Sequence, residues 1–158
     1  MQKIILIAGP TGSGKSEIAT RLAKKINGEI INADSMQVYR EIKILSARPE
    51  KLFNITHYLY GNISVKYNFS AGEWLKKVKL NLKKIINKKK TPIFIGGTGL
   101  YFKLLTEGIS NIPKIPVSIR IKVRKLNTKL GNDKFYNLLI KLDPLVENKI
   151  KKKMIHIG

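Results

Sequence analysis

The sequence predicts an α/β protein that is built on a parallel β-sheet with flanking helices. Two unbroken apolar runs, at 3–8 and 91–97, have the character of strands that are buried on both faces. Each run leads into glycines and is followed by a segment with helical periodicity. Strands that alternate with helices form parallel sheets with right-handed crossovers, so we expect helices to cover the sheet.

The first third of the chain contains two strands with a helix between them. After the strand at 3–8, the segment 17–26 places apolar side chains on one helical face, at Ile18, Leu22, Ala23 and Ile26. The second strand, at 29–34, ends on the carboxylate of Asp34. The segment 35–68 has no clean period, so we expect mostly loops and short elements there.

A longer helix is predicted to begin after Ser70. Glu73 follows three residues later, which gives the capping-box pattern of a helix N-terminus. Apolar residues then recur at helical spacing, at Trp74, Leu75, Val78, Leu82, Ile85 and Ile86. We expect Trp74 to pack in the core. The third strand, at 91–97, is followed by a helix at 99–105.

Two prolines, Pro113 and Pro116, mark a change in the character of the chain. We therefore expect two domains, an α/β core at 1–112 and a smaller helical insertion at 113–158. The insertion is basic, and its helices are predicted to begin at Val117, at the cap residue Asn132 and at Pro144.

Length and composition fit a folded protein of one domain or at most two. The chain has 158 residues, 43% of them hydrophobic, which is enough for a packed core. It has no cysteine, which excludes disulfides, thiolate metal sites and cysteine nucleophiles and agrees with a cytoplasmic location. No apolar run approaches the roughly 20 residues of a membrane helix, so neither a membrane span nor a targeting segment is predicted.

The chain is strongly basic. It has 31 Lys and Arg against 10 Asp and Glu, a formal charge of +21. Such a charge favours a polyanionic partner, nucleic acid before a membrane surface. Compositional drift that loads lysine onto any surface is the competing explanation. The run of lysines at 76–90, which holds no acidic residue, favours the nucleic-acid interpretation.

A glycine-rich motif joins the first strand to the first helix. It fits the pattern G-x-x-x-x-G-K-[ST] with Gly9, Pro10, Thr11, Gly12, Ser13, Gly14, Lys15 and Ser16. Glycines let successive N–H groups point inward around phosphate oxygens, and the helix adds its positive N-terminal end. Lys15 is expected to bridge the phosphates, and the Ser16 hydroxyl to ligate Mg²⁺. The fold is therefore predicted to resemble that of the P-loop NTPases.

The loop does not identify what carries the phosphates. A small-molecule kinase that uses ATP is one possibility, but such enzymes usually end a later strand on an aspartate that helps to hold Mg²⁺. Here the strand at 91–97 leads into Gly96-Gly97-Thr98, and the carboxylate that ends a strand is Asp34.

Several segments together resemble the bacterial tRNA dimethylallyltransferase family over about residues 1–150. They are GPTGSGKS at 9–16, NADSMQVYR at 32–40, SARP at 46–49, HYL at 57–59, FSAGEW at 69–74 and GGTGLYF at 96–102. The resemblance implies transfer of the dimethylallyl group of dimethylallyl diphosphate to N6 of the adenosine 3′ of the anticodon. Diphosphate leaves, and Mg²⁺ assists.

The resemblance also implies roles for individual residues. Asp34 would accept the proton of the attacking amine, while Lys15 stabilises the leaving diphosphate. Thr98 would lie beside the adenine and, with Ser16, near the metal. The residues that would contact tRNA are Asp34, Ser35, Met36, Gln37, Thr98 and Arg120.

Four of these residues have a simpler structural alternative. Asp34 could be a helix cap or an outer ligand of the metal, Gln37 a turn residue, and Thr98 the N-cap of the helix at 99–105. Arg120 alone would be a solvated arginine on a basic helix. His57 is assigned no chemistry.

The chain departs from the family in length, since members are about twice as long. Nothing here matches their second half, so we expect an unpaired sheet edge and a chain that is poorly stable or self-associates, although family members are monomers. A second chain could complete the fold. The alternatives to prenyl transfer are the ATP-dependent kinase and a tRNA-binding remnant without activity.

Overall fold

The computed structural model describes residues 3–49, 54–109, 115–147 and 150. The chain forms two compact units, Met1–Ser110 and Asn111–Gly158. No helix in the described ranges is both long and apolar enough to cross a membrane.

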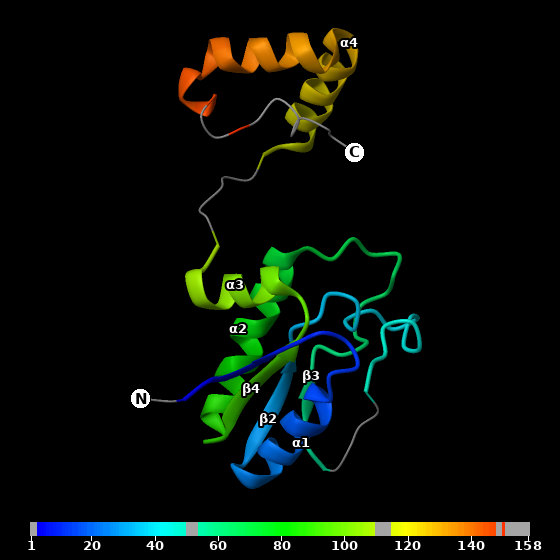
Figure 1. The fold of residues 1–158 in the computed structure, drawn as a ribbon, viewed down its shortest axis with the longest axis vertical. Helices are drawn as coiled ribbons and strands as arrows, with labels where there is room; N and C mark the ends of the chain where they lie inside the picture. Colours follow the sequence, from blue (N-terminus) through cyan, green and yellow to red (C-terminus); the bar gives the residue numbers. More distant parts are fainter. Residues whose placement is uncertain (1–2, 50–53, 110–114, 148–149, 151–158) are drawn as a thin grey trace. The chain divides into compact units, whose positions relative to one another are not determined.

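The first unit is built on a parallel sheet, as predicted, with the short strand β3 (His57–Tyr58) added to the three predicted strands (Figure 1). Its strands lie in the order β1 (Ile5–Ala8), β4 (Thr91–Gly96), β2 (Gly28–Asn32) and β3 (His57–Tyr58). In this register Ile93 of β4 lies between Ile5 and Ile30. The sheet and its helices confirm the predicted P-loop-like α/β fold.

Three helices cover this sheet, α1 (Lys15–Lys25), α2 (Ala71–Asn87) and α3 (Gly99–Glu107). Alternate strand residues point to opposite faces, which separates the core into two clusters. Ile30 and Ile93 pack with Ala19 and Ala23 of α1. Their strand neighbours on the other face pack with α2 and α3, in a cluster that includes Ile31, Phe94, Trp74, Val78 and Tyr101.

The start of α2 is built as predicted. Ser70 is the N-cap and forms a complete capping box with Glu73. Trp74 is fully buried, as expected, and stacks on Tyr101 with ring centroids 4.0 Å apart and planes 15° apart. Its Nε1 donates a hydrogen bond to the backbone oxygen of Asn32 at 3.0 Å, which ties α2 to the end of β2.

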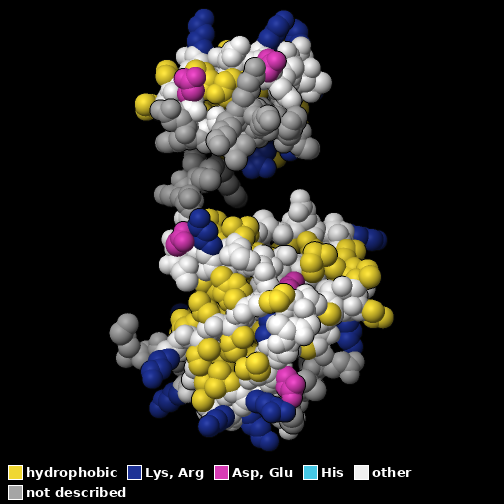
Figure 2. Space-filling view, in the orientation of Figure 1, with side chains coloured by type: hydrophobic (Ala, Val, Ile, Leu, Met, Phe, Trp, Pro, Cys, Tyr) yellow, Lys and Arg dark blue, Asp and Glu magenta, His cyan; other side chains and the backbone are white. Residues whose placement is uncertain are grey.

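The position of β1 differs from the prediction. It was expected to be buried on both faces, but among the described residues it pairs with β4 alone and is an edge strand. Ile4 is 48% exposed and Leu6 41% exposed. Leu6 also lines an apolar cavity of about 210 Å³ with Phe94 and Leu105. Figure 2 shows hydrophobic side chains gathered on the visible face of this unit.

The second unit contains α4 (Val117–Leu142) and a 3₁₀ helix (Pro144–Val146). Gly131 has φ 73° and ψ 164°, so α4 is two helical segments joined at the break expected before Asn132. Pro144 opens a short 3₁₀ helix rather than the longer α-helix predicted there, and residues 148–149 and 151–158 lie outside the described part. None of the described side chains of α4 is buried.

The exposed β1 edge generates the first prediction. A strand that has apolar side chains and, among the described residues, one unpaired edge is a template for pairing with another chain, so the protein should self-associate at micromolar concentration. The double substitution Ile4→Lys and Leu6→Lys should lower its apparent mass in light scattering, because lysine blocks edge pairing. Ile44→Lys, on a loop residue that is 91% exposed, is the matched control. A compact monomer with cooperative unfolding would contradict this expectation.

The buried carboxylate of Glu29, at the amino end of β2, is bound to lysines that follow α2. Glu29 accepts hydrogen bonds from Lys90 Nζ at 2.9 Å, Lys88 Nζ at 3.3 Å and Tyr58 Oη at 2.7 Å. Burial raises the pKa of Glu29, but the hydrogen bonds from Lys90, Tyr58 and Lys88 outweigh it and hold this pKa below its ordinary value of 4.5. The ionised form is therefore the one that stabilises the fold.

Glu29→Gln should lower the free energy of unfolding by about 1–3 kcal/mol at neutral pH. Since the pKa is lowered in the folded state, this contribution is present above the ordinary pKa and is lost as the pH falls through the lower one. Urea unfolding of both proteins between pH 7 and pH 3 measures it. A difference that stays constant over this range would show that the ionised carboxylate is not the stabilising form.

Candidate active site

The glycine loop follows the carboxyl end of β1 and runs directly into α1. Gly12 has φ 81° and Gly14 has φ 76°, conformations that side chains other than glycine rarely adopt. Gly14 is also the N-cap of α1, and no side chain caps this helix. The loop therefore presents backbone N–H groups and the positive end of a helix, which together suit an anion.

Two loop side chains fold back across the turn. Lys15 Nζ donates to the backbone oxygen of Pro10 at 2.7 Å, and Ser13 Oγ donates to the same oxygen at 2.8 Å. The lysine ammonium group thus lies over the loop. Ser16, in the first turn of α1, is half-buried.

The strands β1, β2 and β4 end close together. Two glycines after and at the end of β4, Gly97 and Gly96, let the backbones approach. A Cβ on Gly96 would lie 2.1 Å from the backbone oxygen of Ala33 at the end of β2. A Cβ on Gly97 would lie 3.2 Å from the backbone oxygen of Gly9 and 3.7 Å from Asp34 Oδ2. The structure therefore brings the Asp34 carboxylate and the first residue of the glycine loop to the same glycine.

The Asp34 carboxylate shapes the turn that follows it. Its Oδ1 accepts hydrogen bonds from Met36 N at 2.9 Å and from Gln37 N at 3.4 Å. Thr98 Oγ1 accepts a hydrogen bond from Ser35 N at 2.9 Å and donates one to Ser35 Oγ at 3.3 Å. Thr98 occupies the N-cap position of α3, as expected, but its hydroxyl makes no capping bond and joins the Asp34 turn instead.

The other candidate residues lie in different surroundings. Gln37 is buried, and its Nε2 donates to the backbone oxygens of Ser46 at 3.0 Å and Ala47 at 3.4 Å, which favours a role in the turn. Met36 is 53% exposed beside the carboxylate. Arg120 is exposed on α4 in the second unit.

Two tyrosines near Asp34 were not found from the sequence. Burial raises the pKa of Tyr101 to about 12, and the nearby Tyr39 and Asp34 charges add to the effect. Burial also raises the pKa of Tyr60, with a further contribution from Asp34. Both phenols therefore stay protonated to a higher pH than an ordinary tyrosine does. Ordinary apolar and aromatic patterning gives no signal that would mark either ring as a neighbour of the carboxylate.

The oxygen atoms at the site suit a hard cation. Among the described residues no cluster of three or more His, Cys, Asp or Glu could hold a metal ion. Mg²⁺ needs no such cluster, because it keeps several waters and binds one or two protein oxygens together with substrate phosphates. The hydroxyls of Ser16 and Thr98 and the carboxylate of Asp34 are groups of that kind.

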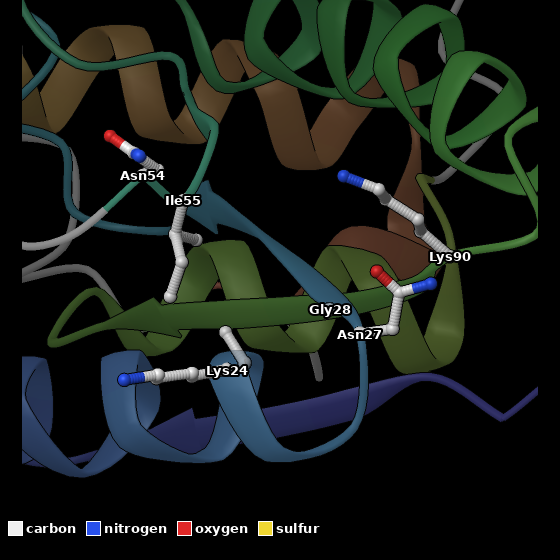
Figure 3. Close-up of a pocket in the computed structure, with 7 residues that line it drawn as sticks. Lys24, Asn27, Gly28, Asn54, Ile55 and Lys90 are labelled. Atoms are coloured by element: carbon white, nitrogen blue, oxygen red, sulfur yellow. The ribbon is translucent and has the colours of Figure 1, made fainter.

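A second cavity, of about 450 Å³, has none of these residues in its lining, and Figure 3 shows the residues that do line it. It is lined by Lys24, Asn27, Asn54 and Lys90 among others. Gly28, at its wall, begins β2, and Lys90 precedes β4, so this cavity lies at the amino ends of the strands. The glycine loop and Asp34 lie at their carboxyl ends, where ligands of parallel sheets bind.

The fold and the glycine loop define an α/β protein of the phosphate-binding P-loop class. Comparison with known proteins narrows this class. The family model described as IPP transferase matches residues 37–156, and the chain belongs to this family.

The curated proteins to which the chain is similar are named tRNA dimethylallyltransferase. The tRNA dimethylallyltransferase of Pelagibacter ubique is 54% identical over 93% of this chain and 48% of its own length. That of Rickettsia prowazekii is 46% identical over 94% and 49%. The chain thus spans about half the length of the curated relatives it matches.

Solved structures to which the chain is similar come from transferases of the same kind. A eukaryotic dimethylallyltransferase acting on tRNA matches with a TM-score of 0.80 and 30% identity, over 96% of this chain and 38% of its own. The tRNA isopentenylpyrophosphate transferase of Bacillus halodurans matches with a TM-score of 0.69 and 27% identity, over 97% and 52%. The resemblance inferred from the sequence is therefore confirmed.

The close approach at Gly96 gives a sharp test of the site architecture. Gly96→Ala should lower the free energy of unfolding by about 3 kcal/mol, because the added Cβ would overlap the Ala33 backbone. Gly99→Ala is the matched control, since a Cβ there meets nothing within 4 Å. Urea unfolding compares the two. Equal stability of both variants would show that β2 and β4 do not end as closely as described.

Proposed function

We propose that this chain carries the donor-binding and catalytic part of a tRNA dimethylallyltransferase. The observation that supports this proposal is the Asp34 carboxylate, which lies beside Gly97 and hence beside the start of the glycine loop. A group that holds a diphosphate and a group that accepts a proton are thus adjacent. Membership of the IPP transferase family favours this activity over an ATP-dependent kinase.

The loop suits the leaving group of dimethylallyl diphosphate. As the bond between the allylic carbon and oxygen breaks, negative charge grows on the diphosphate and the carbon becomes a delocalised cation. The N–H groups of the loop and the ammonium group of Lys15 stabilise that negative charge. Mg²⁺, when bound through oxygens such as those of Ser16 and Thr98, would add further charge stabilisation.

The carboxylate suits the nucleophile. Adenine N6 is a weak nucleophile, and it must lose a proton as it bonds to the allylic carbon. Asp34 Oδ2 faces Gly97 and accepts that proton, while Oδ1 is held by the Met36 amide. Extruding the adenosine from its stack costs about a few kcal/mol, and we assign contacts with the extruded nucleotide to Ser35, Met36 and Thr98, which belong to the Asp34 turn.

The second unit suits the phosphate backbone of tRNA. Arg120 and its lysine neighbours are exposed on α4 and give this helix a positive surface. Such contacts are largely indifferent to sequence and weaken as salt rises. We assign to this unit the binding of the anticodon stem-loop of tRNA. The protein would act in the cytoplasm.

Transfer of label measures the proposed activity. The purified chain, unmodified tRNA, Mg²⁺ and labelled dimethylallyl diphosphate should give labelled RNA. Asp34→Asn should lower the transfer rate by about 10²- to 10⁴-fold with little change in donor binding. Lys15→Ala should weaken both rate and donor binding, whereas Lys25→Ala, at the exposed end of α1, should change neither.

Two outcomes would contradict the proposal. If Asp34→Asn transfers label at the wild-type rate, Asp34 is not the proton acceptor. Salt-sensitive binding of tRNA by a folded wild-type chain that transfers no label would indicate an RNA-binding protein instead.

A further inference from the structure

Asn32 is a fully buried polar residue at the end of β2, two positions before Asp34. Its Nδ2 donates to the backbone oxygen of Asp34 at 2.9 Å and to that of Leu59 at 3.0 Å. Its Oδ1 accepts from the backbone N–H of Asp34 at 3.0 Å. One side chain therefore binds both polar backbone groups of Asp34.

This double contact fixes the direction in which the Asp34 side chain leaves the backbone. The carboxylate is then held at Oδ1 by the Met36 amide, at 2.9 Å. Its other oxygen, Oδ2, lies 3.7 Å from the position that a Cβ on Gly97 would take, and the Gly9 backbone oxygen lies 3.2 Å from the same position. The orientation of the carboxylate thus follows from a chain of hydrogen bonds that begins at Asn32.

We propose that Asn32 is a positioning residue that aims the Asp34 carboxylate at the site beside the glycine loop. The inference rests on the proposed function, in which the N–H bond of the attacking amine breaks and a bond from Oδ2 to hydrogen forms. A proton acceptor works only within hydrogen-bond reach of the proton that it takes, so a small rotation of this carboxylate would slow the reaction.

An asparagine is the residue type that this position needs. Its planar amide offers two donors and an acceptor in one group, and here both donors and the acceptor are used. Aspartate would lose both donors and bury a charge. The donor to Leu59 also secures a residue with φ 64°, which joins the end of β3 to the Asp34 turn.

The first test measures the contact directly. In Asn32→Ala the Asp34 amide should exchange with deuterium at least about tenfold faster than in the wild-type chain, relative to the Ala33 amide. Ala33 N donates to the backbone oxygen of Ile95 at 2.7 Å and serves as the internal reference. Trp74→Phe is the matched control, because it removes the bond to the Asn32 backbone oxygen but leaves the Asn32 side chain in place.

The second test measures the consequence. Asn32→Ala should lower kcat for prenyl transfer by about 10- to 100-fold while KM for dimethylallyl diphosphate stays unchanged. Asn32→Ser, which keeps an acceptor for the Asp34 amide, should recover part of both the exchange protection and kcat. Trp74→Phe should leave kcat within about threefold of the wild-type value, although its stability falls.

Two results would overturn the inference. In one, the Asp34 amide of Asn32→Ala keeps its protection relative to Ala33. In the other, Asn32→Ala and Trp74→Phe lose kcat equally, as expected of a merely structural residue. If Asn32→Ala does not fold, Asn32→Ser supplies the same comparisons. A wild-type chain without transfer activity would defeat the proposed function, whereas amide exchange would still decide whether Asn32 holds Asp34.

Discussion

The carboxyl ends of β2 and β4 lie so close together that no side chain fits between them. Gly96 is at this contact, where a Cβ would stand 2.1 Å from the Ala33 oxygen. Ala33 also forms one hydrogen bond with β4 and one with the residues that follow it, from Ala33 N to Ile95 O at 2.7 Å and from Thr98 N to Ala33 O at 3.3 Å. Because this approach is tight, Asp34 and Thr98 lie in one turn cluster although 64 positions separate them in the sequence.

The contact between the ends of β2 and β4 also places the Asp34 carboxylate relative to the positive groups of the glycine loop. A strand end that lacks side chains leaves room for the Asp34 carboxylate to face the start of the glycine loop, which carries Lys15 and the N-terminus of α1. Around the carboxylate, the polar groups are mostly committed: Asn32 to the Asp34 backbone, and Thr98 to Ser35. Such commitment reduces the number of orientations that the carboxylate can take, and preorganised groups of this kind contribute most to catalysis by charge stabilisation.

Local patterns in the sequence predicted most of this fold. The glycine motif, the apolar runs and the Ser70 capping box are signals within a few residues, and the structure has a loop, strands and a helix start at these places, although β1 is less buried than expected. The signals that failed depend on distant neighbours. The two-residue strand β3 is too short to show a period, and the apolar run of β1 says only that it can be buried, not which strands lie beside it.

The candidate site was predictable only where its residues carry a local signal. Asp34 and the glycine loop stand at strand ends, so topology alone predicts that they meet. Asn32 gives no such signal, since an asparagine near the end of a strand reads as a turn residue. Its role emerges from three hydrogen bonds, one of them to Leu59, which lies 27 positions away.

The edge position of β1 has a consequence for the glycine loop. The loop is joined to the sheet through β1, which pairs only with β4 among the described residues, and through the bond from Gly9 N to Gly96 O at 3.2 Å. An edge strand with half-exposed apolar side chains opens locally at a lower free-energy cost than a central one. The placement of the diphosphate-binding groups therefore depends on the β1–β4 pairing, and any segment that covers the free edge of β1 would hold the loop more firmly beside Asp34.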